Sequence, residues 1–234
     1  MANKIQLNAL GNIEYARREA LNSLRTNLMF CGENIKTIMF TSCNPDEGKS
    51  TVSFDLARSV ADHNQKVLFI DCDMRKSVMV NRYRIKGYDA QQKGLTHFLS
   101  GQAKLDEVVC ETNVPGLSMI MTGPLSPNPT ELLAGDKMKN ALKELKEQFD
   151  LILIDTPPLG MVIDAAILAP ACDGTILVVA SNYTSRRQAV KVKKQLEMTG
   201  CRMLGAVMNK AGLDSNGYYY NGYYKKGYYQ YYGE

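Results

Sequence analysis

Short apolar runs recur along this chain of 234 residues, and segments with helical patterns separate most of them. Runs of this kind are typical of buried parallel strands in a sheet whose two faces are both covered by helices. The alternation therefore predicts a doubly wound, mostly parallel α/β sheet, in a single domain over residues 1–212. The expected strands cover residues 36–42, 66–71, 117–121, 151–155, 175–180 and 204–208, and the expected helices cover 13–30, 51–62, 136–148 and 185–199.

Composition excludes several classes of protein. Hydrophobic residues make up 45% of the chain and charged residues 22%, which is ordinary for a globular domain. The net charge of +4 is too small to argue for direct binding of nucleic acid. Six widely spaced cysteines and only two histidines predict free thiols in a reducing cytoplasm and no zinc cluster. We find no signal peptide and no membrane-spanning run, so we expect a cytoplasmic protein that reaches a membrane only through a partner.

The tyrosines are distributed unevenly. Nine of the thirteen lie in the last eighteen residues, where glycine recurs every few positions and no helical or strand periodicity is visible. This composition predicts a disordered tail over residues 213–234. The nine tail tyrosines are Tyr218, Tyr219, Tyr220, Tyr223, Tyr224, Tyr228, Tyr229, Tyr231 and Tyr232.

Residues 43–51, Cys-Asn-Pro-Asp-Glu-Gly-Lys-Ser-Thr, stand between an expected strand and an expected helix, as in a P-loop NTPase. In such a loop the backbone N–H groups bind phosphate oxygens, Lys49 reaches the β- and γ-phosphates, and the Ser50 hydroxyl ligates Mg²⁺. Cys43 stands where the strict motif has glycine. The predicted nucleotide-binding residues are Asp46, Glu47, Gly48, Lys49, Ser50 and Thr51, the last beside the α-phosphate.

Carboxylates follow two other expected strands. Asp71 and Asp73 end one of them, and Asp155 ends another. Each alone is compatible with a helix cap or a surface acid, but the carboxyl ends of parallel strands meet at one edge, where such sheets bind ligands. We therefore predict one Mg-ATP site, with Ser50, Asp71, Asp73 and Asp155 as candidate metal ligands. Asp71 is our first choice for the base that accepts a tyrosine proton, and Asp73 remains the alternative.

The strand with its P-loop and four further motifs together resemble the bacterial tyrosine kinases that control capsular and exopolysaccharide synthesis. The two that carry chemistry are Val67-Leu-Phe-Ile-Asp-Cys-Asp-Met-Arg75 and Ile152-Leu-Ile-Asp-Thr-Pro-Pro158. The other two cover residues 94–101 and 123–133, and the tyrosine-rich tail extends the resemblance to essentially the whole chain. The resemblance implies a fold similar to that of the deviant P-loop ATPases that position septa and plasmids.

The resemblance also implies an activity and partners. ATP phosphorylates the tail tyrosines, largely between neighbouring subunits of a ring. A separate transmembrane activator, typical of Gram-positive bacteria, recruits the kinase to the inner face of the membrane, and other protein substrates are possible. Nine phosphates add about −14 to −18 charges, so we hypothesise that phosphorylation loosens the ring until a phosphatase resets it.

Individual residues follow from the same resemblance. Asn209 matches a position that contacts adenine, and Glu19 and Arg25 match the ends of the subunit-contact motif E-x-x-R-x-x-R. The middle arginine of that motif is replaced by Asn22. Asp46 stands where glycine is common, and Ser77 replaces a usual proline.

Two other functions compete with the kinase. The first is an ATPase switch of the septum- or plasmid-positioning kind, whose members carry a lysine five positions before the P-loop lysine; this chain has Asn44 there. The second is a non-enzymatic module whose tail self-associates or stacks on nucleic-acid bases. Phosphate on the tail tyrosines distinguishes the kinase from both.

Overall fold

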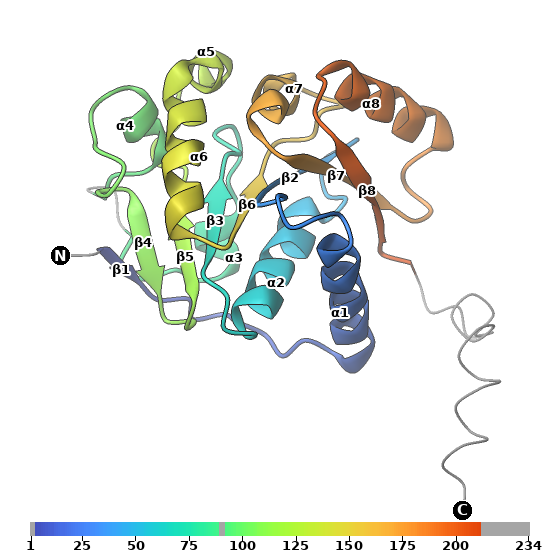
Figure 1. The fold of residues 1–234 in the computed structure, drawn as a ribbon, viewed down its shortest axis with the longest axis horizontal. Coiled ribbons are helices and arrows are strands. Elements are labelled where there is room, and N and C mark those ends of the chain that lie inside the picture. Colours follow the sequence, from blue (N-terminus) through green and yellow to red (C-terminus); the bar gives the residue numbers. More distant parts are fainter. Residues whose placement is uncertain (1–2, 89–91, 212–234) are drawn as a thin grey trace, which may run out of the picture.

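The structure, a computed structural model, describes residues 3–88 and 92–211 and is built on one eight-stranded sheet (Figure 1). Its strand order is β1-β4-β5-β3-β6-β2-β7-β8, and every neighbouring pair is parallel except β4 and β5. The strands are β1 Asn3–Ile5, β2 Thr37–Ser42, β3 Val67–Asp71, β4 Val109–Thr112, β5 Leu117–Ile120, β6 Leu151–Asp155, β7 Gly174–Ala180 and β8 Met203–Asn209. The predicted fold class is confirmed.

Helices cover both faces of the sheet (Figure 1). Helices α1 to α3 pack on one face, and α4 to α8 pack on the other. The helices are α1 Tyr15–Met29, α2 Lys49–Ala61, α3 Met79–Arg82, α4 Leu95–Leu99, α5 Pro129–Ala134, α6 Asp136–Gln148, α7 Asp164–Leu168 and α8 Arg186–Met198, with a short 3-10 helix at Ala169–Ala171.

The pleat of the central strands explains why two separate cores form. In β3, Leu68 and Ile70 belong to the core under α4 to α8, whereas Val67 and Phe69 belong to the core under α1 and α2. Successive side chains of a strand point to opposite faces, so a strand that is apolar at every position serves two cores at once. Phe69 also meets Phe54 of α2 edge to face, with ring centroids 5.4 Å apart.

Two strands of the structure, β1 and β4, were not predicted from the sequence. Both are short, and they pair with each other at one edge of the sheet, where side chains are only partly buried. The proline-rich segment 123–129 was expected to be a rigid connection, and α5 begins at its last proline, Pro129. The predicted tail, 213–234, lies outside the described residues.

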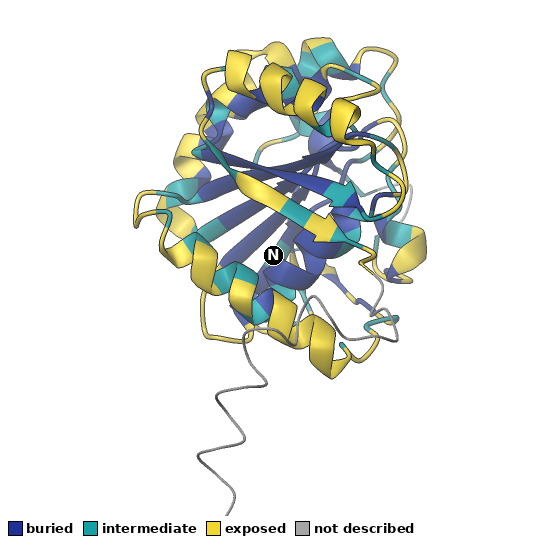
Figure 2. Cartoon of the chain, turned by 90° about the vertical axis from the view of Figure 1, so that its right-hand side faces the viewer, coloured by how far each residue is buried: buried dark blue, intermediate teal, exposed yellow. Residues whose placement is uncertain are grey.

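Burial differs sharply between the sheet and its helical cover (Figure 2). The central strands are buried along their whole length, whereas α8 exposes most of its surface. Within the described ranges, no helix has both the length and the apolar character needed to cross a membrane.

Candidate nucleotide-binding and catalytic site

The strand order brings three predicted site segments to one edge of the sheet. Strand β2, which leads into residues 43–48, lies between β6 and β7, and β3 is the other neighbour of β6. Asp71 at the end of β3 lies directly opposite Asp155 at the end of β6. The predicted convergence of the P-loop with these carboxylates is therefore present in the structure.

The loop before α2 has the conformation of a phosphate-binding turn. Gly48 precedes the helix with φ of +91°, in the left-handed region that favours glycine. A Cβ atom at Gly48 would lie 2.0 Å from Nδ2 of Asn209. Both the backbone conformation and the contact therefore require glycine at this position. The first N–H groups of a helix lack acceptors within the helix, which suits the start of α2 to bind phosphate.

The Glu47 carboxylate holds this loop from inside. It is fully buried and accepts hydrogen bonds from the Cys43 backbone N–H at 2.7 Å, from Asn44 Nδ2 at 3.0 Å and from the Thr184 hydroxyl at 2.5 Å. Glu47 was predicted to contact nucleotide, but its side chain is engaged with the protein. Cys43, which replaces the first glycine of the motif, uses its backbone N–H for this contact.

Lys49 lies among oxygen atoms at the centre of the site. Its Nζ is 3.2 Å from Asp73 Oδ2, 3.4 Å from Asp155 Oδ2 and 3.1 Å from Ser50 Oγ. Burial alone would lower the pKa of Lys49, but the attraction of Asp155 and Asp73 outweighs it and raises the pKa. The ammonium group is thus held charged at the position from which a P-loop lysine reaches phosphate.

Asp71 is oriented by different partners. Its carboxylate accepts hydrogen bonds from the Ser77 hydroxyl at 2.5 Å and from the Asp73 backbone N–H at 3.1 Å. Burial and the neighbouring Asp155 raise the pKa of Asp71 to about 7. Ser77, which departs from the family's usual proline, therefore contacts the residue that we predict to be the base.

The residues at this edge fit a magnesium ion bound together with nucleotide. Asp155 Oδ1 is buried without a hydrogen-bond partner among the described residues, so one carboxylate oxygen is free to ligate a cation. No group of three or more histidine, cysteine or acidic side chains suited to a metal occurs in the described part of the chain. The three carboxylates predicted as ligands, those of Asp71, Asp73 and Asp155, thus do not form such a group by themselves. Mg²⁺ bound with nucleotide usually takes one or two carboxylates and completes its shell with phosphate oxygens and water.

Two further predicted nucleotide contacts are occupied by protein groups. The Thr51 hydroxyl accepts a hydrogen bond from Arg82 Nη1 of α3 at 2.5 Å. Asn209, at the end of β8, donates from Nδ2 to the Glu47 carbonyl at 2.9 Å. Asp46 is exposed with φ of +60°, and its carbonyl accepts a hydrogen bond from Lys210 Nζ at 2.6 Å.

The predicted subunit-contact residues lie on α1, which precedes β2 and the phosphate loop in the chain. Glu19 accepts a hydrogen bond from Asn22 Nδ2 at 3.2 Å, so the substituted residue of the motif pairs within its own helix. Arg25 has one buried guanidinium nitrogen, Nη1, without a partner among the described residues. Arg17 forms an ion pair with the buried Asp55 of α2. The structure contains one protomer, so the contact roles of Glu19 and Arg25 stay predictions.

One ion pair at the site could not be predicted, because no sequence pattern identified both of its partners. Arg75 donates from Nε and Nη2 to the two oxygens of Asp164, at 2.7 and 2.9 Å, and Thr130 donates to the same carboxylate at 2.7 Å. Arg75 was visible in the Asp-x-Asp-x-Arg motif, but Asp164 and Thr130 are 89 and 34 residues from their partners. Only the folded chain brings the three together, and they tie the segment after β3 to α5 and α7.

Comparison with known proteins gives consistent results. Residues 35–199 match a family model described as an AAA domain. The tyrosine-protein kinase CpsD of Streptococcus agalactiae is 44% identical over 192 residues, which are 82% of this chain and 82% of that protein. The solved kinase domain of the Escherichia coli tyrosine kinase ETK has a TM-score of 0.78 at 33% identity, covering 82% of this chain and 75% of that one. The septum site-determining protein MinD of Pyrococcus horikoshii, solved with Mg-ADP, has a TM-score of 0.65 at 25% identity, covering 77% and 72%.

These similarities favour the kinase over the ATPase switch. The ETK kinase domain is more similar in fold than MinD, with a TM-score of 0.78 against 0.65. Asn44, at the position where an ATPase switch was expected to have a lysine, binds Glu47 and Gln188 within the chain. The identity to CpsD spans most of both chains. A P-loop, an Asp-x-Asp strand end and a third strand-end aspartate lie together at one sheet edge, as the kinase resemblance implied. The chain belongs to the bacterial tyrosine-protein kinases.

Proposed function

We propose that this chain transfers the γ-phosphoryl group of ATP to tyrosines of residues 213–234, largely on a neighbouring subunit. The single observation that carries the proposal is the meeting of Lys49 with Asp71, Asp73 and Asp155 at one sheet edge, in a chain whose tail holds nine tyrosines. Phosphoryl transfer depends on positioning and charge stabilisation, which this set of residues is suited to supply.

The proton of the acceptor hydroxyl goes to Asp71. The phenolic oxygen forms a bond to the γ-phosphorus, the bond to the bridging oxygen breaks with its electrons leaving on ADP, and the phenolic proton moves to the Asp71 carboxylate. Asp73 is the weaker candidate because its carboxylate is paired with Lys49 at 3.2 Å. Among the described residues, the Asp71 carboxylate instead accepts hydrogen bonds from Ser77 and a backbone N–H, which orient it without an ion pair.

Ser50 and Asp155 are the side chains that would hold Mg²⁺, with Asp73 beside them. When bound, this ion neutralises charge on the phosphate oxygens. The likeness to MinD, which was solved with Mg-ADP, supports this assignment. Asn209 supports the adenine side of the site, because it lies at the end of β8 against the loop.

The partners are proposed from the family. We infer a phosphorylation-dependent ring, a separate membrane activator that recruits the chain to the inner face of the membrane, and a tyrosine phosphatase that resets it. Regulation of capsular or extracellular polysaccharide synthesis is the expected role.

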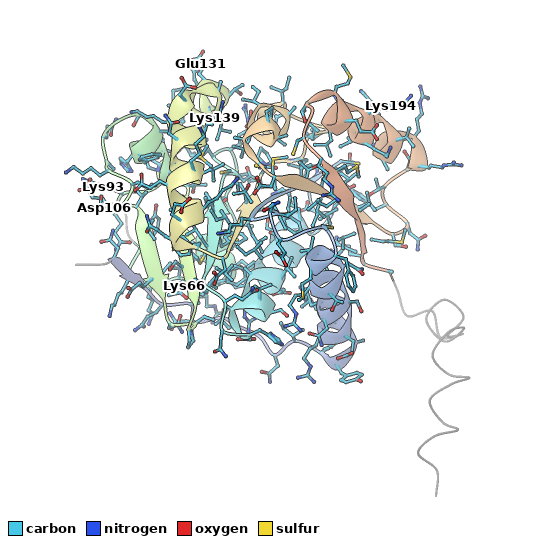
Figure 3. All side chains as sticks on the ribbon, viewed as in Figure 1. Lys66, Lys93, Asp106, Glu131, Lys139 and Lys194 are labelled. Carbon is cyan, nitrogen blue, oxygen red and sulfur yellow. The ribbon has the colours of Figure 1, made fainter. Side chains whose placement is uncertain are left out.

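Incubation with Mg-ATP, followed by mass spectrometry of the C-terminal peptide, tests the activity. We expect phosphate on the wild-type tail, none after Lys49→Met, and a large loss after Asp71→Asn. Asp106→Asn, a change of the same type at an exposed residue before β4, which β5 and β3 separate from β6 (Figure 3), is the matched control and keeps full activity. ATP hydrolysis with an unmodified tail, even with an activator fragment present, would instead support the ATPase switch.

A mixing experiment tests transfer between subunits. A Lys49→Met chain keeps its tail, and a second chain with phenylalanine at the nine tail positions keeps its active site. Phosphate on the Lys49→Met tail requires transfer from one chain to the other, whereas an unmodified tail means that transfer occurs within a chain.

A further inference from the structure

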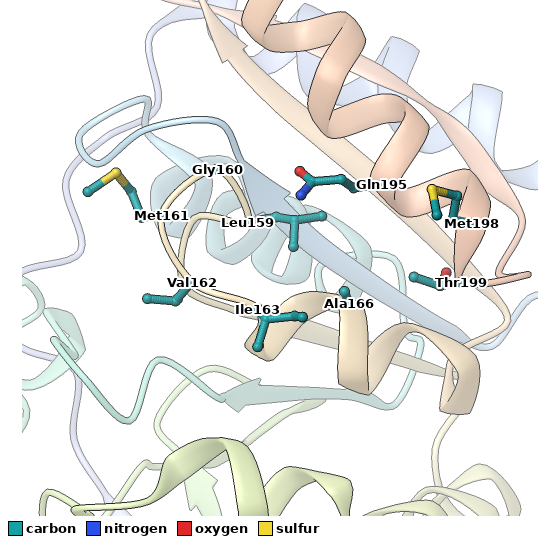
Figure 4. Close-up of a pocket in the computed structure, with 9 residues that line it drawn as sticks. All are labelled: Leu159, Gly160, Met161, Val162, Ile163, Ala166, Gln195, Met198 and Thr199. Carbon is teal, nitrogen blue, oxygen red and sulfur yellow. The ribbon is translucent and has the colours of Figure 1, made fainter.

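An apolar groove lies between the β6–α7 loop and the C-terminal half of α8 (Figure 4). Its volume is about 470 Å³. One wall includes Met161 and Ile163, and the other includes Gln195 and Met198. The exposed fractions are 64% for Met161, 60% for Ile163 and 87% for Met198, so the residues that the structure describes leave this apolar surface open to a ligand.

A basic stripe borders the groove on α8. Arg187, Lys191, Lys194 and Met198 are spaced by four, three and four residues, so they share one face of the helix, and Lys191 is one turn before the groove residue Gln195. All three cations are exposed, and none of the eight ion pairs among the described residues involves them. The acid of α8, Glu197, is paired with Lys193 at 2.5 Å.

We propose that this groove binds the chain's own C-terminal segment, residues 213–234, once its tyrosines are phosphorylated. The inference rests on the kinase activity proposed above, which makes the ligand. It adds a second site for the tail, next to the phosphate loop but lined by other residues, that selects the product over the unmodified tyrosines.

The chemistry of phosphotyrosine matches both parts of this surface. The ring is an apolar body that fits among methionine side chains, which pack readily against aromatic groups. The phosphate carries about −1.5 to −2 charges and forms charge-assisted hydrogen bonds with arginine and lysine. An unmodified tail offers the rings without the charge, and its Lys225 and Lys226 repel the stripe. The groove therefore discriminates by charge.

The place where the tail begins makes the same chain's tail the favoured occupant. The last described residues leave β8 beside the phosphate loop, where Lys210 contacts the Asp46 carbonyl. The groove borders the same loop, because a Cβ at Gly160 would lie 2.1 Å from the Cys43 carbonyl oxygen. Twenty-three residues follow Ala211, and they can extend to about 75 Å, which is several times the radius of gyration of about 17 Å expected for a domain of this size.

Peptide binding tests the proposal without using the kinase reaction. A fluorescent peptide of residues 213–234 is prepared with either tyrosine or phosphotyrosine at Tyr223, Tyr224, Tyr228 and Tyr229. Each is titrated against the full, phosphatase-treated chain in the absence of ATP, and binding is followed by fluorescence polarisation. We expect the phosphopeptide to bind at least about tenfold more tightly than the unmodified peptide, and its affinity to fall with ionic strength.

Matched variants locate the site. Lys191→Glu with Lys194→Glu should weaken phosphopeptide binding about tenfold or more, since four units of charge change at the stripe. Lys139→Glu with Lys143→Glu makes the same change on the exposed face of α6, and it should leave the affinity unchanged; Figure 3 shows Lys139 and Lys194 on their separate helices. Met198→Ser should weaken binding by removing the apolar contact, whereas Met29→Ser, at another exposed methionine, should not.

Three results overturn the proposal. They are equal affinity for the two peptides, unchanged phosphopeptide affinity after the Lys191 and Lys194 substitutions, and binding of α8 to anionic phosphatidylglycerol vesicles without binding of phosphopeptide. None of these three results bears on the proposed kinase activity, because the peptide experiments contain no ATP. An unmodified tail in the mass-spectrometric assay, in contrast, overturns the kinase activity and leaves the peptide affinities as measured.

Discussion

Replacement of Glu47 by alanine should damage nucleotide binding although this carboxylate points away from phosphate. The wild-type side chain is fully buried and accepts hydrogen bonds from the Cys43 N–H, from Asn44 and from Thr184. Alanine leaves the Cys43 N–H without an acceptor in a buried environment, which costs about 1–3 kcal/mol. Asn44 and Thr184 are only partly buried, so water can replace part of what they lose.

We therefore expect Glu47→Ala to lower the free energy of unfolding by about 3 kcal/mol, within the ~5–15 kcal/mol of a typical domain, so the chain still folds. For a chain of this size that loss lowers the melting temperature by roughly 6–12 °C. Because the start of the loop is released, the affinity for Mg-ADP should fall by about tenfold or more.

Thermal unfolding and calorimetric titration with Mg-ADP measure the two effects. Glu47→Gln keeps an acceptor for the Cys43 N–H and should lie between wild type and Glu47→Ala. Thr184→Val removes the third contact and also the acceptor of the Ala180 backbone N–H, and it should cost about 1–3 kcal/mol. Glu144→Ala, at an exposed glutamate of α6, is the control and should change neither quantity. If Glu47→Ala melts and binds like Glu144→Ala, the buried carboxylate does not hold the loop and the reasoning is refuted.

Three other predictions follow from the described contacts. Gly48→Ala should abolish detectable Mg-ADP binding in calorimetry, because its Cβ would lie 2.0 Å from Asn209 Nδ2. Gly32→Ala is the control: φ is +119° there, but no atom lies within 4 Å of the added Cβ. It should destabilise the fold without affecting binding. Burial raises the pKa of Asp164, but the hydrogen bonds from Arg75 and Thr130 outweigh it and hold the pKa below its usual value. This carboxylate therefore stabilises the fold above pH ~4 and loses that contribution as the pH falls further. Urea unfolding from pH 7 to 3 should show this loss in wild type and not in Asp164→Asn, which should be about 2 kcal/mol less stable at pH 7 because Arg75 is partly exposed. Burial raises the pKa of Cys43 to about 12 and the pKa values of Cys110 and Cys201 to about 11. A thiol reagent at pH 8 should therefore react quickly with one cysteine of the native protein, the half-buried Cys31. Several quickly reacting thiols would contradict the burial.

The central strands and the long helices were predictable because their patterns are local. Strand β6 is apolar throughout and ends in Asp155, and helix α6 was expected and found at the same residues, 136–148. Strands β1 and β4 carry no comparable pattern, because each pairs at the edge of the sheet and buries only part of its side chains. Their pairing depends on residues 107 positions apart, such as Asn3 and Cys110, which no local window contains.

The same distinction applies to the site. Lys49, Asp71, Asp73 and Asp155 stand at strand ends, where the rule for parallel sheets predicts that they meet. The rule does not predict which neighbouring side chains form hydrogen bonds with each of these four residues. Ser77 was visible only as a departure from the family, yet its hydroxyl binds Asp71. Glu47 was predicted only as a nucleotide contact, and the structure adds that its side chain binds the protein. Such contacts depend on side-chain rotamers and on partners as distant as Thr184.

The P-loop is held largely by residues outside its own motif. Thr184 precedes α8, and Asn209 and Lys210 lie at the end of β8, so all three belong to the unit formed by β7, α8 and β8. That same unit carries the basic stripe of α8 and the point where the tail begins. Through Thr184 and Asn209 this unit contacts the carboxylate and the carbonyl of Glu47, and so it holds the loop that we propose binds ATP. Because the tail follows β8 in the sequence, the tyrosines that we propose as acceptors are attached to the unit whose residues hold the phosphate loop.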